Sequence, residues 1–420
     1  LFNLSDVAIA GKYAYNTYIA LGAVGSTTTL VSLFTGLLIG LGAGVNVAVA
    51  RGLGMGSDED VERTTHSSAI ICFAVGVLTC LLCVFFAEPM LQMLNTKEEF
   101  LPGAVLYLKL FAIGLPGMGL YNCGNGILSA TGDTKRPLIY LAVAGVLNVI
   151  LNLVFVIGCN MSAEGVAIAS AIAQWVSALL ILAHLLRRKD ACRLEVRKLR
   201  LHRMASKRVL MIGIPSGLQN AIFAVANLFV QAGLNSFDEI TVSGAAAAAN
   251  ADTLVFNILA AFYTACASFV SRNWGAGNKE RITKTYLISM FYAFAVGSIC
   301  GGLLLVFGRQ FLGLFADKPE VIDAGMDRLR IMAFSYGFGS LMDASIAASR
   351  GIGKSIIPTF MVIMGSCVFR VIWIYTVFAY FHTVPSLYLL YIFSWVITGI
   401  AECIYFRYAY KKFVLKAQVW

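Results

Sequence analysis

Apolar residues run through this chain in long stretches that short polar segments separate. A helix needs about 20 mostly apolar residues to cross the hydrocarbon core of a bilayer. Stretches of this kind predict eleven membrane-spanning helices, at residues 21–50, 66–87, 102–127, 137–158, 164–186, 209–235, 243–270, 284–307, 326–349, 356–380 and 385–406. Residues 1–11 look like the end of a twelfth helix and lack the basic segment of a signal peptide. The pattern predicts an all-α polytopic membrane protein with twelve spans, the first of them incomplete.

Basic residues gather in alternate loops between these helices. The segment 187–208 carries ten of the 32 Lys and Arg residues, and smaller groups occur near 51–63, 135–136, 272–284, 350–354 and 407–416. Loops rich in Lys and Arg stay in the cytoplasm. We therefore expect a multi-pass protein of the plasma membrane with both termini cytoplasmic. The net charge of +10 is then a signal of topology, and no nucleic-acid partner is expected.

Composition supports the membrane class and argues against a metal site. Only 13% of residues are charged, against roughly 25% in soluble domains. The ten cysteines lie mostly inside apolar runs at irregular spacing, and the one CxxC pair, Cys80 and Cys83, has no second pair or His nearby. We expect these thiols to be small buried apolar groups, and expect no metal and no cofactor.

Several patches in the second half of the chain match patches in the first half without gaps at one constant spacing, which we call the repeat offset. It is the spacing that places Arg51–Gly56 on Arg272–Gly277, and it also places Gly132 on Gly353 and Asp6 on Asn227. Six crossings per half give both halves the same orientation, which defines a parallel repeat. The prediction is an N-terminal lobe at 1–186, a basic cytoplasmic linker at 187–208, and a C-terminal lobe at 209–420 with a short cytoplasmic tail.

Two similar lobes suit transport by alternating access, in which the lobes rock around a central site. The glycine-rich turns at 51–56 and 272–277 end their helices sharply, so each pair of neighbouring helices can move as a rigid hairpin. The chain contains no GxxxxGK[ST] phosphate-binding loop. Uphill transport would then draw on an ion gradient.

Several segments together resemble the multidrug and toxic compound extrusion (MATE) family of bacterial type. They are Leu1–Asp6, the two glycine-rich turns, Gly126–Pro137, Leu147–Asn152, Gly165–Gln174, Gly213–Pro215 and Phe369–Val371. The resemblance implies a monomeric antiporter in the lipid bilayer that exports cationic or amphipathic drugs and metabolites in exchange for H⁺ or Na⁺.

Asp6 is the candidate for ion coupling, because a carboxylate at mid-bilayer costs about 2.5–3.5 kcal/mol and usually serves a function. It resembles the acidic residue of the family's N-terminal lobe that binds the coupling cation. The matching partners are Asn148 and Asn152, which share a helix face at i, i+4, and Ser170. The family often has an acid at the place of Asn152. Its absence leaves Asp6 as the lone titratable group, which suits proton exchange because burial favours the neutral carboxyl.

The second half holds the candidate site for substrate or a second ion, formed by Asp252, Asp343 and Arg370. Asp252 is expected to attract a cationic substrate or ion. Asp343 and Arg370 are expected to pair, because a buried Arg without a carboxylate is costly. Glu402, near the cytoplasmic end of the last helix, is expected to reach the membrane interface.

Three other functions fit the sequence less well. A lipid-linked oligosaccharide flippase of the same superfold would need several Arg or Lys around its cavity, whereas Arg370 is the one clear intramembrane cation and three acids favour cationic cargo. A membrane enzyme would need clustered catalytic groups, and the four histidines lie at span ends or in loops. A channel fits the two-lobe repeat less well than a moving site does.

Overall fold

The computed structural model describes residues 6, 9, 17–316 and 318–416. Contacts between residues divide the chain into two compact units, Leu1–Ala221 and Ile222–Trp420. The boundary falls inside a helix, later than the predicted start of the C-terminal lobe at 209, because the first turns of that helix pack against the N-terminal unit. Of the expected first helix, only Asp6 and Ile9 are described, and both are helical.

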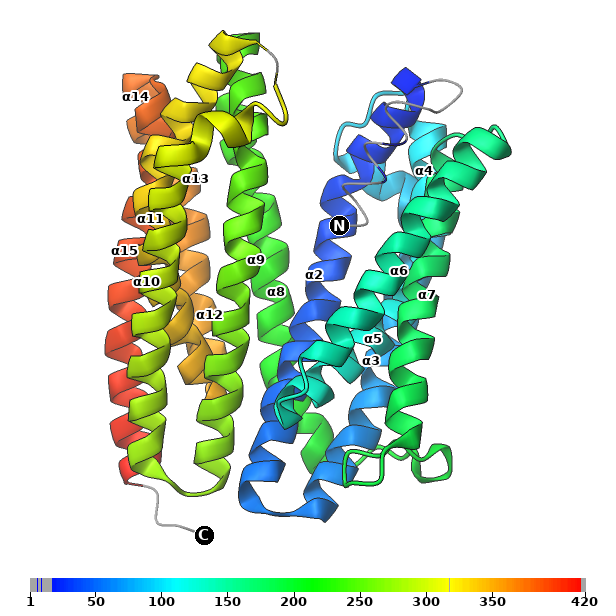
Figure 1. The fold of residues 1–420 in the computed structure, drawn as a ribbon, viewed down its shortest axis with the longest axis vertical. Helices are drawn as coiled ribbons and strands as arrows, with labels where there is room; N and C mark the ends of the chain where they lie inside the picture. Colours follow the sequence, from blue (N-terminus) through cyan, green and yellow to red (C-terminus); the bar gives the residue numbers. More distant parts are fainter. Residues whose placement is uncertain (1–5, 7–8, 10–16, 317, 417–420) are drawn as a thin grey trace. The chain divides into compact units, whose positions relative to one another are not determined.

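The N-terminal unit is a bundle of helices that cross back and forth (Figure 1). Its helices are α2 (Thr17–Met55), α3 (Asp58–Met93), α4 (Leu101–Ala112), α5 (Leu115–Thr131), α6 (Lys135–Leu153) with the π-helical turn η1 (Val154–Gly158), and α7 (Ala163–Arg187). A short 3₁₀ turn, η2 (Val196–Lys198), precedes α8 (Arg203–Leu234), which begins in this unit and ends in the next. Both α3 and α7 pack on α5.

The C-terminal unit has a similar order of helices, and π-helical turns interrupt one of its long helices (Figure 1). It contains α9 (Glu239–Gly275), α10 (Lys279–Leu312), α11 (Pro319–Gly351), the run α12 (Ile356–Val362), η3 (Ile363–Val368), α13 (Phe369–Trp373), η4 (Ile374–Phe378) and α14 (Ala379–Phe381), then α15 (Val384–Ala409) and η5 (Tyr410–Leu415). Here η3, η4 and η5 are π-helical. α11 contacts α9, α10 and α15 and is the centre of the unit.

The two units agree in detail with the repeat offset. The starts of α3, α6 and α7 at 58, 135 and 163 correspond to those of α10, α12 and α15 at 279, 356 and 384. The turn glycines also correspond: Gly132 has φ +90° and Gly353 has φ +78°. The amides of Gly132 and Gly353 each bond back into the preceding helix, in the pattern of a Schellman cap.

The predicted spans all fall on observed helices. Among the described residues, nine helices are long and apolar enough to cross a membrane, and a tenth span arises if α4 and α5 count as one. α11 is not among these nine helices, and it carries several charged residues, Arg328 and Asp343 among them. The sequence did not predict the 44° bend between α4 and α5. At this bend Gly114 lies so close to α7 that a Cβ would sit 2.3 Å from Gln174 Oε1.

Glycines let α2 and the first turns of α8 approach closely within the N-terminal unit. A Cβ on Gly40 would lie 2.2 Å from Gly217 N, and one on Gly44 would lie 2.7 Å from Gly213 N. Asn220 donates a hydrogen bond to the carbonyl of Gly36 at 3.2 Å. Small residues spaced by four are typical of tight helix pairs in membranes.

The predicted linker, residues 187–208, is folded against the start of α3. The backbone N–H of Glu195 donates to His66 Nε2 at 3.0 Å, and Lys198 forms an ion pair with Glu62 at 3.0 Å. Cys192 in this segment is buried. The segment is therefore a docked element of the N-terminal unit, and its place as a border between lobes stays a prediction.

Candidate functional site

Asp6 is a fully buried carboxylate that accepts four hydrogen bonds. Ser170 Oγ donates to Oδ2 at 2.6 Å, and Asn152 Nδ2 donates to Oδ1 at 2.8 Å. Longer bonds come from Asn148 Nδ2 to Oδ1 and from Tyr107 OH to Oδ2, both at 3.4 Å. We call these five residues the Asp6 cluster.

Three helices position the donors of the Asp6 cluster. Asn148 and Asn152 lie one turn apart on α6, Ser170 lies on α7, and Tyr107 lies on α4. The donors also bond to one another, since Asn148 Nδ2 donates to Ser170 Oγ at 3.0 Å. The structure thus brings together the four residues predicted from the sequence. Tyr107 was missed because a tyrosine within an apolar run is not distinctive.

All four donors of the Asp6 cluster are neutral groups. The ion pairs found among the described residues include none for Asp6. Asn152 Oδ1 is also buried without a hydrogen-bond partner in the described part of the chain. An ionised carboxylate in such surroundings is costly without a cation. The cluster can therefore hold either a proton on Asp6 or a small hard cation ligated by oxygen atoms.

Asp252 on α9 lies in a second buried cluster, in the C-terminal unit. It forms an ion pair with Arg328 on α11 and accepts a hydrogen bond from Tyr336 OH. Arg328 also donates to the carbonyl of Ala245 at 2.8 Å and lies 5.0 Å from the ring centroid of Tyr388. The sequence predicted Asp252 to be a charge open to a cation, but Arg328 neutralises it. Arg328 was missed because its place in the chain resembles that of a cation in a loop or at a span end.

Arg370 on α13 does not form the expected pair with Asp343. Its Nη1 donates instead to Asn227 Oδ1 at 3.0 Å, and its guanidinium lies 4.4 Å from the ring centroid of Tyr391. The pairing prediction is wrong because an amide oxygen and aromatic faces surround this cation instead of a carboxylate. Asp343 is half-buried on α11 and makes no hydrogen bond or ion pair with any described residue.

Glu402 on α15 also differs from its prediction. It was expected to reach the interface but is 0% exposed, because α15 packs along α11. Within the residues that the structure describes, neither of its carboxyl oxygens has a hydrogen-bond partner.

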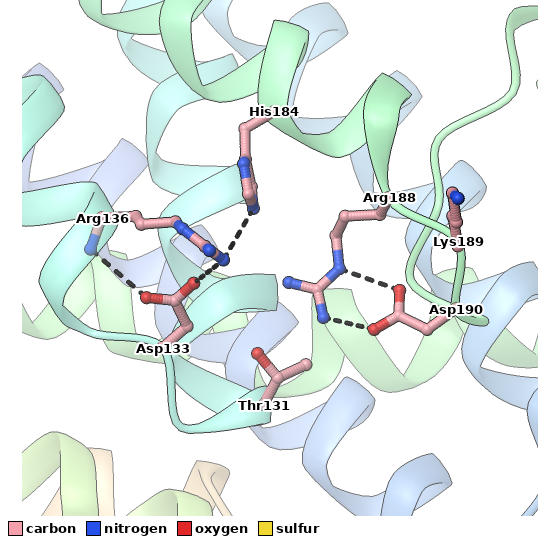
Figure 2. Close-up of a pocket in the computed structure, with 7 residues that line it drawn as sticks. All are labelled: Thr131, Asp133, Arg136, His184, Arg188, Lys189 and Asp190. Atoms are coloured by element: carbon pink, nitrogen blue, oxygen red, sulfur yellow. Dashed lines mark hydrogen bonds and ion pairs between the residues drawn. The ribbon is translucent and has the colours of Figure 1, made fainter.

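A pocket of about 590 Å³ lies where α5 ends, α6 begins and α7 leads into the linker (Figure 2). Two of its three Arg and Lys residues pair with acids: Arg136 bonds Asp133 at 2.7 Å, and Arg188 Nε bonds Asp190 at 2.8 Å, while Lys189 also lines the pocket. The hydrogen bond from Arg188 holds the pKa of Asp190 below its usual value. Both acids of the pocket are thus held by arginines, and we assign this polar surface no transport role.

A protein-family model described as MatE matches residues 1–154 and 215–376. The chain belongs to the MATE family. This confirms the resemblance based on the sequence motifs and identifies the protein as a multi-pass membrane transporter.

Relatives with assigned names extend across most of the chain. A protein of Bacillus subtilis named as a probable multidrug resistance protein, YpnP, is 26% identical over 76% of this chain and 71% of its own length. A protein of Shewanella oneidensis named as an FAD transporter is 24% identical over 80% of this chain and 75% of its own length. The relatives thus differ in the cargo that their names specify.

Solved MATE structures show the same fold. An outward-facing multidrug resistance MATE transporter matches with a TM-score of 0.90 at 22% identity, covering 99% of this chain and 93% of that one. A transporter of the MOP superfamily from Pyrococcus furiosus, described as having a binding pocket of reverse polarity, also matches at 0.90 with 21% identity and the same coverage. The predicted all-α polytopic fold of two six-helix lobes is confirmed.

Proposed function

We propose that this MATE protein is a secondary-active exporter of amphipathic small molecules, in which Asp6 carries the coupling ion. The observation that supports the proposal most directly is the fully buried Asp6 carboxylate, whose four hydrogen-bond donors are all neutral. Intramembrane carboxylates in such surroundings typically relay protons or bind ions. Export would proceed by rocking of the two lobes in the plasma membrane, with both termini in the cytoplasm.

The proton is the proposed coupling ion. The Asp6 cluster supplies one carboxylate together with amides and hydroxyls, and it lacks the second acid that the family often has at the place of Asn152, so the case for a two-carboxylate Na⁺ site is weaker. A proton needs only the single carboxyl group. Protonation on the outside and release on the inside would then alternate with cargo binding.

The cargo was expected to be cationic, in line with the relatives named for multidrug resistance. Part of that argument was the negative charge of Asp252, which Arg328 neutralises in the structure. The relative named as an FAD transporter points to cargo beyond cations. We therefore keep the amphipathic class in this proposal and treat the sign of the cargo separately.

A lipid-linked oligosaccharide flippase remains the alternative. Such cargo calls for several free cations around the cavity. Among the buried arginines described in the C-terminal unit, Arg328 is paired with Asp252, Arg350 donates to Tyr263 and to Thr359, and Arg370 has no carboxylate partner among the described residues. Fewer cations are thus available than the flippase requires.

Reconstitution into proteoliposomes tests the proposal. Export of a fluorescent amphipathic dye is measured under an imposed pH gradient and, separately, under a Na⁺ gradient, for the wild type and Asp6→Asn. We expect the pH gradient to drive export and Asp6→Asn to lower the driven rate at least tenfold. Full gradient-driven export by Asp6→Asn, or export that depends on neither gradient, would contradict the proposal.

A further inference from the structure

Arg370 is a buried cation without a carboxylate partner in the described part of the chain. Its side chain is 2% exposed, and one hydrogen bond joins Nη1 to Asn227 Oδ1 at 3.0 Å. Its Nε is buried and has no hydrogen-bond partner among the described residues. A guanidinium with N–H groups left over is a strong, unused donor for an anion.

Three aromatic rings surround the guanidinium of Arg370. The centroids of Tyr391, Phe223 and Trp395 lie 4.4, 5.3 and 5.8 Å from it. Such faces replace part of the lost hydration of a cation. They do not neutralise its charge, so the cluster keeps a net positive charge inside an apolar unit. Flat aromatic rings beside a guanidinium whose Nε has no acceptor among the described residues are suited to a flat molecule that carries an anionic group.

The local backbone sets this position apart. Arg370 sits on α13, a five-residue α-helical segment between the π-helical turns η3 and η4. π-Helical turns inside helices are frequent at functional sites. The corresponding helix of the N-terminal unit has one such turn, η1, after Asn152.

The repeat places this cluster where the Asp6 cluster lies in the other unit. At the repeat offset, Asn227 corresponds to Asp6 and Tyr391 corresponds to Ser170. Arg370 directly follows Phe369, the counterpart of Asn148. One copy therefore presents a carboxylate to neutral donors, whereas the other presents a guanidinium to a neutral acceptor.

We propose that the cargo is a planar aromatic anion that binds at this cluster in the C-terminal unit. The residues that bind its anionic group and its ring system are Arg370, Asn227, Phe223, Tyr391 and Trp395. The proposal rests on the proposed export function and names the class of its cargo. A carboxylate or phosphate of the cargo accepts hydrogen bonds from the guanidinium of Arg370, and the aromatic side chains contact the rings of the cargo. Asn227 is exposed, so the anionic group of the cargo, which is a stronger acceptor, can displace its amide oxygen from Arg370.

Binding to the purified full chain tests the site without transport. The probes are carboxyfluorescein and rhodamine 123, which share a three-ring xanthene core and carry opposite charge. We expect the wild type to bind carboxyfluorescein. Arg370→Gln should raise the Kd for carboxyfluorescein about tenfold or more, because the variant loses one charge-assisted hydrogen bond. Arg370→Lys should be intermediate, because it keeps the charge without the planar fork.

Asn227→Asp is the second variant, and it keeps Arg370. The new carboxylate should pair with Arg370 and exclude carboxyfluorescein without reducing the affinity for rhodamine 123, because the pair no longer repels a cation. The matched control is Arg330→Gln, which removes an exposed Arg of α11 that pairs with Asp327 at 2.9 Å. It should leave both affinities unchanged.

Two binding results would overturn the inference: no carboxyfluorescein binding by the wild type, or equal binding by the wild type, Arg370→Gln and Asn227→Asp. Strong competition by anionic phosphatidylglycerol with no dye selectivity would assign the site to a lipid headgroup and also overturn it. Transport separates this inference from the export function. Gradient-driven movement of rhodamine 123 alone, lost in Asp6→Asn, would leave the export function standing and refute the anionic cargo.

Discussion

At the scale of single residues, the Asp6 cluster depends on the identity of residue 152. Asn152 supplies the second shortest hydrogen bond to Asp6, at 2.8 Å, and keeps the cluster to one carboxylate. A carboxylate in its place would lie within hydrogen-bonding distance of Asp6. Two such groups repel when both are ionised, and a shared proton or a cation relieves the repulsion.

Asn152→Asp should therefore change the coupling ion. We expect export by this variant to become dependent on Na⁺, because two carboxylates with amide and hydroxyl oxygens suit a hard cation better than one does. The measurement is dye export from proteoliposomes with and without a Na⁺ gradient at constant pH. Asn125→Asp on α5 is the control, since Asn125 lies outside the Asp6 cluster and accepts a hydrogen bond from Ser129. Export by Asn152→Asp that ignores Na⁺ would count against the assigned role of this position.

Polar residues on regular helices could be predicted from the sequence, whereas side-chain partners on different helices could not. Asn148 and Asn152 could be placed on one face because helical spacing fixes their relation. The partner of Arg370 could not be predicted, because it depends on which side chain of another helix reaches the guanidinium. Arg328 illustrates the same limit, since its ion pair with Asp252 joins α9 to α11 between residues far apart in the sequence.

At the scale of helices, the closest packing is between α2 and the first turns of α8. The chain carries glycine at positions 36, 40 and 44 of α2 and at 213 and 217 of α8. Each missing side chain lets one backbone touch the other. The sequence predicted both spans but gave no sign that their glycines face each other, because apolar runs carry little information about which face packs where.

Gly40→Ala should destabilise the protein. Its Cβ would lie 2.4 Å from Gly217 Cα, so backbone must shift, and overpacking of this kind costs about 1–3 kcal/mol. Thermal unfolding in detergent is the measurement, with a lower Tm expected. Gly25→Ala on the same helix is the control, because no described atom lies within 4 Å of the added Cβ. Equal Tm values for the two variants would show that the close approach is not required.

At the scale of the whole molecule, the duplication could be predicted from the sequence, but the difference between the buried clusters of the two copies could not. Gly, Pro and Arg residues at fixed positions mark the turns, and the observed helix starts repeat at the same offset. The two buried clusters diverged instead at positions where one copy has Asp6 and Ser170 and the other has Asn227 and Tyr391. Only the contacts in the folded structure show that these positions form clusters in both copies.

The predicted topology can be tested with the native thiols. Cys159, in the loop between η1 and α7, is the exposed one among the ten cysteines, and the charge pattern predicts that this loop lies outside the cell. A membrane-impermeant maleimide should label intact cells through Cys159, and Cys159→Ser should abolish the labelling. Ala276→Cys in the Cys159→Ser background should react only after permeabilisation. Labelling of intact cells at 276 would invert the proposed orientation.

The guanidinium of Arg370, which is unpaired among the described residues and leads to the proposal of an anionic cargo, also has an electrical consequence. Exchange of one external proton for one internal monovalent cation moves no net charge. Exchange of the same proton for a monovalent anion moves two positive charges inward in each cycle. At a membrane potential of about 100 mV, negative inside, those charges contribute about 4.6 kcal/mol, equivalent to a concentration ratio of more than about a thousandfold. Exchange of a proton for the proposed anionic cargo would thus be electrogenic, and voltage would drive it without a pH difference.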